Sequence, residues 1–201
     1  ENDTNLGFVA TVNRGMAYDN ARDALLLNSD VEVAGNWLHR LRDAAYVNDL
    51  IGSVTPFSNN ATLCSFPNIC KDNQLLFGLS CAQIDESFAA LFSSTDIIDL
   101  PTGVGFCMYI RRECLDRVGV FDVRTFGRGY GEENDWCQRA FAVGWRSVQL
   151  ANCFVYHKGR VSFADEHDPR IANAMQVLDE RYPDYHRSIQ GVIADDPAKG
   201  Y

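Results

Sequence analysis

The chain has 201 residues, of which 46% are hydrophobic and 22% charged, a composition typical of a globular protein with room for a sizeable core. Its formal net charge of −9 argues against nucleic acid as the main partner, because binding to phosphates requires a basic surface. No apolar run approaches the roughly 18 residues of a membrane span, so no transmembrane segment is expected.

Seven cysteines are present, and none of them belongs to a C-x-x-C pair. Several, such as Cys107 and Cys153, lie in apolar runs, which is typical of buried and reduced thiols in a cytosolic protein. Cys64 and Cys70 flank a polar loop, but two thiols without neighbouring His or Cys ligands are a weak zinc pattern. We therefore expect a cytoplasmic protein.

The first part of the chain predicts a helix at 13–17 and a strand at 24–27, which ends at the polar turn 28–30. A short apolar run bounded by polar residues favours a strand that is buried on both faces, as in a parallel sheet. In such sheets ligands bind beyond the carboxyl ends of the strands. The acids Asp30 and Glu32 could there hold a divalent cation that neutralises phosphates. An ordinary turn explains the same residues, because Asn, Ser and Asp favour turns.

The middle and end of the chain alternate between helical and strand patterns, and a polar loop at 56–73 interrupts them. Loops of this length are often functional or mobile. Helices are expected to begin at Gly35 and to cover 74–93, 113–118, 171–181 and 184–193, and strands are expected at 51–55, 104–110, 145–150 and 153–156, with 96–100 irregular.

An acidic segment follows the glycine-rich loop 127–131. Glu132, Glu133 and Asp135 lie where an apolar helical pattern begins with Trp136. A helix N-terminus favours negative charge, so a carboxylate that must stay ionised and act as a base suits this place. Capping explains the acids equally well, because acidic residues are common in first helical turns and each stabilises a helix by only a few tenths of a kcal/mol.

His157 ends an apolar strand near the end of the predicted sheet. A neutral imidazole is a good ligand for manganese-like ions and for zinc. A histidine that is merely hydrogen-bonded within the structure is the alternative interpretation.

Together these segments resemble the glycosyltransferases of family 2, which have the GT-A fold. The resemblance covers roughly residues 5–163, and it depends on the order and spacing of the motifs rather than on any single one. The matching segments are Asn5-Leu6-Gly7-Phe8, Asn13-Arg14-Gly15, Leu25-Leu26-Leu27-Asn28-Ser29-Asp30-Val31-Glu32, Gly35-Asn36-Trp37-Leu38, Gly105-Phe106-Cys107-Met108-Tyr109-Ile110-Arg111-Arg112, Val118-Gly119-Val120-Phe121-Asp122, Gly131-Glu132-Glu133-Asn134-Asp135, Val143-Gly144-Trp145-Arg146 and His157.

The resemblance implies an α/β fold with a GT-A-like mixed, mostly parallel sheet flanked by helices. It implies a core at 1–163 and a C-terminal helical extension at 164–201. The core would lack the family's first strand, helix and strand, which bind the nucleotide. Either the protein has lost nucleotide binding or the chain is a fragment of a longer, multidomain protein. We expect the fragment, because an exposed sheet edge would otherwise need cover, and such a fragment would bind a donor poorly by itself.

The resemblance also implies a donor and metal site. The segment Asn28-Ser29-Asp30 falls on the family's D-x-D motif, where Asn28 departs from the usual acid. Asp30 matches the metal ligand, and His157 matches the histidine that completes a site for Mn²⁺ or Mg²⁺. Asn13, Asn28, Ser29 and Asp30 would contact the donor.

The catalytic base is implied in the same way. Glu132-Glu133 falls on the family's E-D pair, whose second residue is the general base, so the resemblance gives this role to Glu133. Glutamate in place of aspartate adds one methylene to the side chain. Glu132, Asp135 and Trp136 would contact the acceptor.

The implied function is transfer of a hexosyl or deoxyhexosyl group, with inversion, from a nucleotide-diphosphate sugar to a hydroxyl of a saccharide or lipid-linked saccharide. The resemblance places such an enzyme in bacterial surface polysaccharide synthesis, in the cytoplasm or held at the inner face of the membrane by other domains. Two alternatives stay open. One is a non-catalytic module that binds carbohydrate or nucleotide sugar, and the other is a metal-dependent hydrolase that uses water as the nucleophile.

Overall fold

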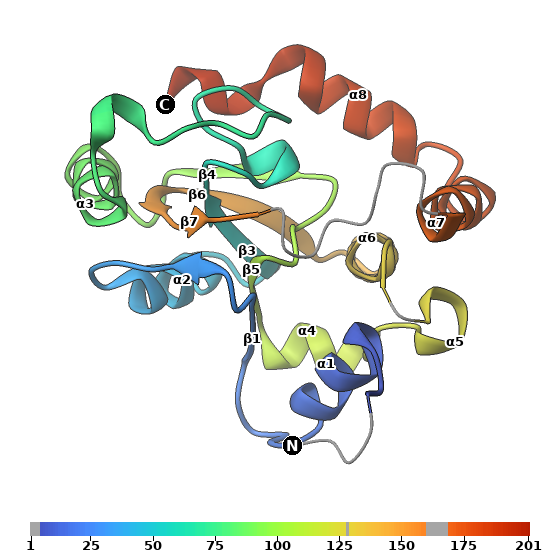
Figure 1. Ribbon diagram of the computed structural model, residues 1–201. Coiled ribbons are helices and arrows are strands. Elements are labelled where there is room, and N and C mark those ends of the chain that lie inside the picture. The colour runs from blue at the N-terminus through green and yellow to red at the C-terminus, as the bar shows by residue number, and fades with distance from the viewer. Residues whose placement is uncertain (1–4, 128, 160–168) are drawn as a thin grey trace.

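The computed structural model describes residues 5–127, 129–159 and 169–201. It is a mixed α/β structure, built around a five-stranded sheet with the strand order β1-β5-β3-β6-β4 (Figure 1). A second, two-stranded sheet joins β2 to β7. The strands are β1 (Ala24–Leu27), β2 (Val31–Glu32), β3 (Ile51–Phe57), β4 (Ile97–Leu100), β5 (Cys107–Ile110), β6 (Arg146–Phe154) and β7 (Tyr156–His157).

The mixed α/β class predicted from the sequence is confirmed, but the sheet is less parallel than expected. Among the four pairings of the described five-stranded sheet, only β3 with β6 is parallel. Strand β1, expected to be buried on both faces of a parallel sheet, pairs antiparallel with β5 at the edge, and Leu27 is 44% exposed. The error has a simple cause, because an apolar run shows that a strand packs against something but not which way its neighbour runs.

Helices surround the sheet. In Figure 1, α8 runs across the top of the molecule and α2 lies to the left of β1. The helices are α1 (Phe8–Met16), α2 (Trp37–Ala45), α3 (Cys81–Leu91), α4 (Arg112–Val118), α5 (Val123–Phe126), α6 (Glu132–Ala142), α7 (Pro169–Arg181) and α8 (Tyr185–Asp195), with short 3-10 turns η1 (Thr62–Cys64), η2 (Leu76–Gly78) and η3 (Pro197–Gly200).

Several element boundaries differ from the predictions. Helix α3 begins at Cys81 rather than at 74, because Ser80 and Gln83 form a reciprocal capping box that fixes the first turn. The segment expected to be irregular at 96–100 contains β4, and the two strands expected at 145–150 and 153–156 form the single strand β6 followed by β7. The helices expected at 171–181 and 184–193 are confirmed as α7 and α8. The expected domain boundary at 163–164 lies outside the described residues.

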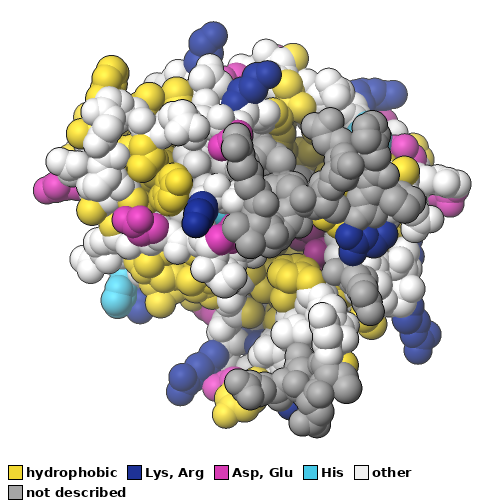
Figure 2. Space-filling view, viewed as in Figure 1, with side chains coloured by type: hydrophobic (Ala, Val, Ile, Leu, Met, Phe, Trp, Pro, Cys, Tyr) yellow, Lys and Arg dark blue, Asp and Glu magenta, His cyan; other side chains and the backbone are white. Residues whose placement is uncertain are grey.

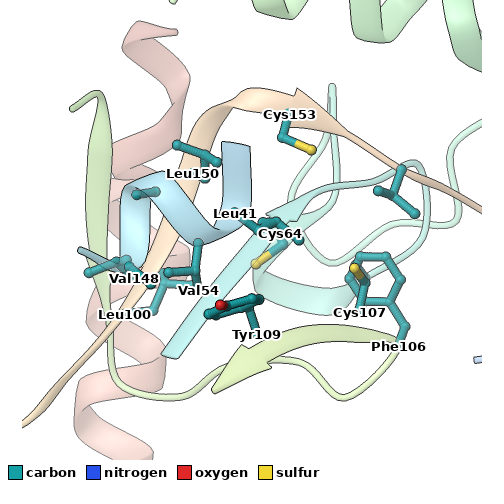
Figure 3. Close-up of a cluster of buried hydrophobic side chains, with 14 of the residues drawn as sticks. Leu41, Val54, Cys64, Leu100, Phe106, Cys107, Tyr109, Val148, Leu150 and Cys153 are labelled. Atoms are coloured by element: carbon teal, nitrogen blue, oxygen red, sulfur yellow. The ribbon is translucent and has the colours of Figure 1, made fainter. Parts of the chain in front are cut away.

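The main core cluster packs α2 and η1 against the sheet (Figure 3). It contains Leu41, Val54, Cys64, Leu100, Phe106, Cys107, Tyr109, Val148, Leu150 and Cys153 among its members. All seven cysteines are free, and every one except Cys70 is buried. Within the described residues, no helix is long and apolar enough to cross a membrane.

Candidate functional site

A cavity of about 660 Å³ collects side chains from segments that are far apart in the sequence. Its volume is within the range of about 300–1,000 Å³ that is usual for ligand sites. It is lined by the turn after β1, the segment 60–63, the loop before β5, the start of α6, His157 of β7, and parts of α7 and α8. Figure 2 shows acidic side chains beside hydrophobic ones near the centre of the visible face.

Asp30 and His157 meet on one side of this cavity. The pairing of β2 with β7 places Val31 opposite His157, and Lys158 donates its backbone N–H to the Asp30 carbonyl at 3.0 Å. As a result, His157 Nε2 lies 3.5 Å from Asp30 Oδ1. Both side chains are largely buried, and Oδ2 of Asp30 is a buried oxygen without a hydrogen-bond partner.

The protonation of His157 indicates what this pair can bind. Its Nδ1 lies 2.6 Å from the backbone carbonyl of Asn60, which can only accept a hydrogen bond, so Nδ1 carries a proton. If Nε2 is unprotonated, its lone pair faces the Asp30 carboxylate and the two repel unless a cation lies between them. Histidines that ligate metals commonly donate their other N–H to a backbone carbonyl in this way. The donor set therefore fits a divalent cation, with an imidazolium–carboxylate ion pair as the alternative state.

A metal would need further ligands from outside the protein. Among the described ranges 5–127, 129–159 and 169–201, no three His, Cys, Asp or Glu side chains converge on one point. Divalent cations in phosphate-binding sites are often held by one or two protein groups and completed by substrate phosphates and water. Asp30 and His157 match that arrangement.

Two residues that support this pair were not identified from the sequence. The Phe106 ring stacks on the His157 ring at 5.2 Å, and the Phe106 carbonyl accepts a hydrogen bond from the backbone N–H of Asn28 at 2.8 Å. The carbonyl of Asn60 fixes the imidazole tautomer. Neither contact can be predicted from the sequence. The contact of Asn60 uses a backbone carbonyl, which every residue has, and Phe106 cannot be distinguished in the sequence from other aromatic residues of the core.

Glu132 and Glu133 also line the cavity, from the start of α6. The residue before the helix, Gly131, has φ +87°, and no side chain caps the first turn. Glu132 is 4% exposed, and its Oε2 is a buried atom without a hydrogen-bond partner. Glu133 is half-buried, and a β-carbon added to Gly105 would lie 3.5 Å from its Oε1.

Burial changes the acidity of both groups. It raises the pKa of Glu132 to about 8, and repulsion from Glu133 adds to the effect. Burial also raises the pKa of Glu133, although the backbone N–H groups of Glu133 and Gly105 favour the charged form. In this pair desolvation therefore opposes the helix N-terminus, which favours the charged form. A carboxyl group whose pKa is raised toward neutrality is better matched to general base catalysis.

Asp135 and Trp136, expected to contact an acceptor, lie elsewhere. Asp135 is fully buried and accepts hydrogen bonds from Arg139 at 2.8 Å, Arg181 at 2.7 Å and Tyr182 at 2.8 Å, so it ties α6 to α7. Trp136 is also fully buried and donates its indole N–H to the Gly119 carbonyl at 2.8 Å. Neither is among the described residues that line the cavity, and the geometry gives both a structural role.

The expected donor contacts divide in the same way. Asn28 and Asp30 line the cavity. The side chain of Asn13 makes two hydrogen bonds to the backbone of Phe121, at 2.8 and 3.0 Å, and so joins α1 to the segment before α5. Ser29 is exposed and, like Asn13, is not among the described lining residues.

The C-terminal helices complete the cavity. Arg170 of α7 lines it, with its guanidinium 5.2 Å from the centre of the Tyr130 ring. Asn134 donates to the Tyr185 hydroxyl at 2.6 Å and to Thr102 at 3.2 Å, which connects the start of α6 to α8. These residues were also missed, because nothing in the local sequence indicates that α7 and α8 return to the site.

Comparison with known proteins identifies the fold. No model of a known protein family matches the chain, and no curated protein matches its sequence. A crystal structure of GalNAc-T7 with UDP, GalNAc and Mn²⁺ aligns with a TM-score of 0.63 and 16% identity, over 92% of this chain. A mannosyltransferase from Pyrobaculum calidifontis, in complex with GDP-Man and Mn²⁺, aligns with a TM-score of 0.46 and 12% identity, over 97% of this chain. The chain spans 36% and 56% of the lengths of these two proteins.

At this level of identity the first comparison establishes the fold alone. The chain has a GT-A-like fold, similar to that of a solved glycosyltransferase, as the family resemblance implied.

Proposed function

We propose that the protein transfers a sugar from a nucleotide-diphosphate sugar to a hydroxyl group of an acceptor, with inversion at the anomeric carbon. The observation that carries the proposal is that Asp30 and His157 line the same cavity as the Glu132–Glu133 pair, within a GT-A-like fold. Membership of the family 2 type and a role in bacterial surface polysaccharide synthesis are parts of the proposal supported by the sequence resemblance.

In the proposed reaction Glu133 is the general base. Its carboxylate removes the proton from the acceptor hydroxyl as the oxygen attacks the anomeric carbon. The new carbon–oxygen bond forms while the bond to the diphosphate breaks, and the diphosphate leaves with the electron pair. Glu132 shares the buried environment, and its raised pKa favours the state in which Glu132 holds the proton of the pair and Glu133 is the carboxylate that can accept one.

The other side of the cavity would receive the diphosphate. Asp30 Oδ2 and His157 Nε2 are the groups that would hold a divalent cation there. Such a cation supplies charge stabilisation to a departing diphosphate. Arg170, the cationic side chain among the described lining residues, adds a positive charge on the α7 side.

The test compares three glutamine variants in a transfer assay, for which the protein is expressed in its full natural length and offered donor and acceptor panels. Glu133→Gln is expected to lower kcat by roughly 10²–10⁴-fold, the usual contribution of a general base. Glu86→Gln removes an exposed carboxylate on α3 and is expected to leave kcat unchanged. Glu132→Gln separates the two buried acids and is expected to retain more activity than Glu133→Gln.

Three outcomes would refute the proposal. Unchanged transfer by Glu133→Gln would remove the base. Nucleotide-sugar breakdown that is indifferent to every acceptor would favour a hydrolase. Donor binding without any turnover would favour a binding module.

A further inference from the structure

Part of the cavity lining is apolar, and one face of α8 contributes three of its side chains. Tyr185, Ile189 and Ile193 of α8 all line the cavity and are four residues apart, so they form one stripe along the helix. Leu63 of η1 and Met175 of α7 add further apolar side chains to the lining. In Figure 1, α8 passes above the η1 segment.

The folding of the chain does not account for the whole of this stripe. Ile189 and Ile193 pack against the core cluster that contains Leu63 and Leu100, yet both remain only half-buried, because their other side faces the cavity. Apolar surface left open inside a well-formed concave pocket is typical of a ligand site. A ligand that covers it must itself be apolar there.

The position of the stripe indicates which substrate it meets. Its first member, Tyr185, is hydrogen-bonded to Asn134, the residue next to the proposed base Glu133. The stripe therefore continues from the acceptor side of the proposed reaction, whereas Asp30 and His157 lie on the side assigned to the donor. A hydroxylated sugar placed against isoleucine would lose hydrogen bonds to water without replacement.

We propose that the acceptor is an amphiphile, a sugar that carries an alkyl or aryl group, with this apolar group lying along the Ile189–Ile193 stripe of α8. The inference rests on the proposed transferase function, because that function defines the acceptor side. It narrows the acceptor to a glycolipid-like or aryl glycoside class.

Binding without turnover tests the inference. The probes are octyl β-glucoside, kept below its micelle concentration, and methyl β-glucoside, titrated calorimetrically into the full-length protein. Each buried methylene increases affinity roughly fourfold, so the octyl compound is expected to bind more than tenfold tighter than the methyl compound. Ile193→Asn is expected to weaken octyl binding about fivefold or more and to leave methyl binding unchanged.

Val192→Asn is the matched control. Val192 is the neighbouring residue, is also half-buried against the same core cluster, and is not among the described lining residues. It is expected to cost similar stability but no affinity for the octyl compound. Met175→Gln, which nearly preserves volume, is the second variant if Ile193→Asn does not fold, and it is expected to weaken octyl binding selectively.

Three results would overturn the inference. The first is that the octyl and methyl compounds bind with equal affinity. The second is that Ile193→Asn and Val192→Asn lose equal affinity for the octyl compound. The third is that Ile193→Asn binds UDP or GDP more weakly and that the nucleotide displaces the octyl compound. The last result would assign the stripe to the donor. Because none of these measurements requires turnover, a failure of the transferase proposal in the Glu133→Gln assay remains distinguishable from a failure of this inference.

Discussion

Replacing Asp135 by Asn tests whether this acid acts in folding or in binding. Its carboxylate is fully buried between α6 and α7 and accepts hydrogen bonds from Arg139, Arg181 and Tyr182. Asparagine keeps the shape of the side chain but removes the charge and one of the two acceptor oxygens. The guanidinium groups of Arg139 and Arg181 would then face a neutral amide, whose NH₂ group is itself a donor and cannot accept their hydrogen bonds.

The magnitude follows from the exposure of the partners. Breaking a fully buried ion pair costs about 3–5 kcal/mol. The side chains of Arg139 and Arg181 are 29% and 36% exposed, so water screens part of the loss, and Arg181 keeps its contacts to Asp122 and Thr125. We expect about 2–3 kcal/mol of destabilisation. For a chain of this size each kcal/mol lowers Tm by about 2–4 °C, which gives a decrease of about 4–12 °C.

The assay is thermal unfolding together with ligand titration. Asp99→Asn is the matched control, because Asp99 also forms a two-point pair with an arginine, Arg146, but its side chain is 67% exposed. That variant is expected to lose less than about 1 kcal/mol. At temperatures where Asp135→Asn is folded, its ligand affinity is expected to equal that of the wild type. An unchanged Tm combined with lost acceptor binding would refute the structural role and restore Asp135 to the acceptor site.

Three further changes test other parts of the site. The folded state binds a proton on Glu132 that the unfolded chain releases above about pH 4.5, so the stability of the wild type is expected to fall between about pH 5 and pH 8. In thermal melts Glu132→Gln is expected to flatten this pH dependence, and an unchanged slope would contradict the raised pKa of Glu132. Mn²⁺ at about 100 times its Kd is expected to stabilise the wild type by about 2.7 kcal/mol but not Asp30→Ala, and an equal shift in both would remove Asp30 from the metal site. Gly131→Ala is expected to lower the free energy of unfolding by about 1–3 kcal/mol, because φ is +87° and the new methyl would lie 2.9 Å from Phe126. Gly15→Ala in α1, with open space around it, is the control and should be neutral or stabilising. Equal melting temperatures for the two variants would contradict this strain.

The sequence predicted most of the fold because the helical signals are local. The stripes of α2, α7 and α8 and the apolar runs of β1, β3 and β5 each specify an element without information from distant residues. The direction of the strands was not predictable in this way. Strand β1 has the same apolar run whether its neighbour is parallel or antiparallel, and only the pairing with β5, about 80 residues away, decides it.

The candidate site was predictable where chemistry is carried by charged or titratable side chains. Asp30, Glu133 and His157 each follow a recognisable local pattern, and the structure brings them to one cavity. Asp135 and Trp136 show the limit of such reasoning. The acidic pattern alone does not show which of the three carboxylates turns toward the cavity, because that depends on the elements that pack around α6. In α6 the residues 132–134 face the cavity, whereas Asp135 turns toward α7 and Trp136 toward the core.

The two sides of the site are held together by the residues just before β5. Gly105 lies against the Glu133 carboxylate, and Phe106 stacks on the imidazole of His157. The strand that follows, Cys107–Ile110, is wholly buried between β1 and β3 of the sheet. The relative position of the proposed base and the proposed metal ligands is therefore set by the core rather than by the surrounding loops. This arrangement suits a reaction in which attack on one side of a carbon and departure on the other must be aligned, because preorganised geometry lowers the barrier only if it does not relax when substrates bind.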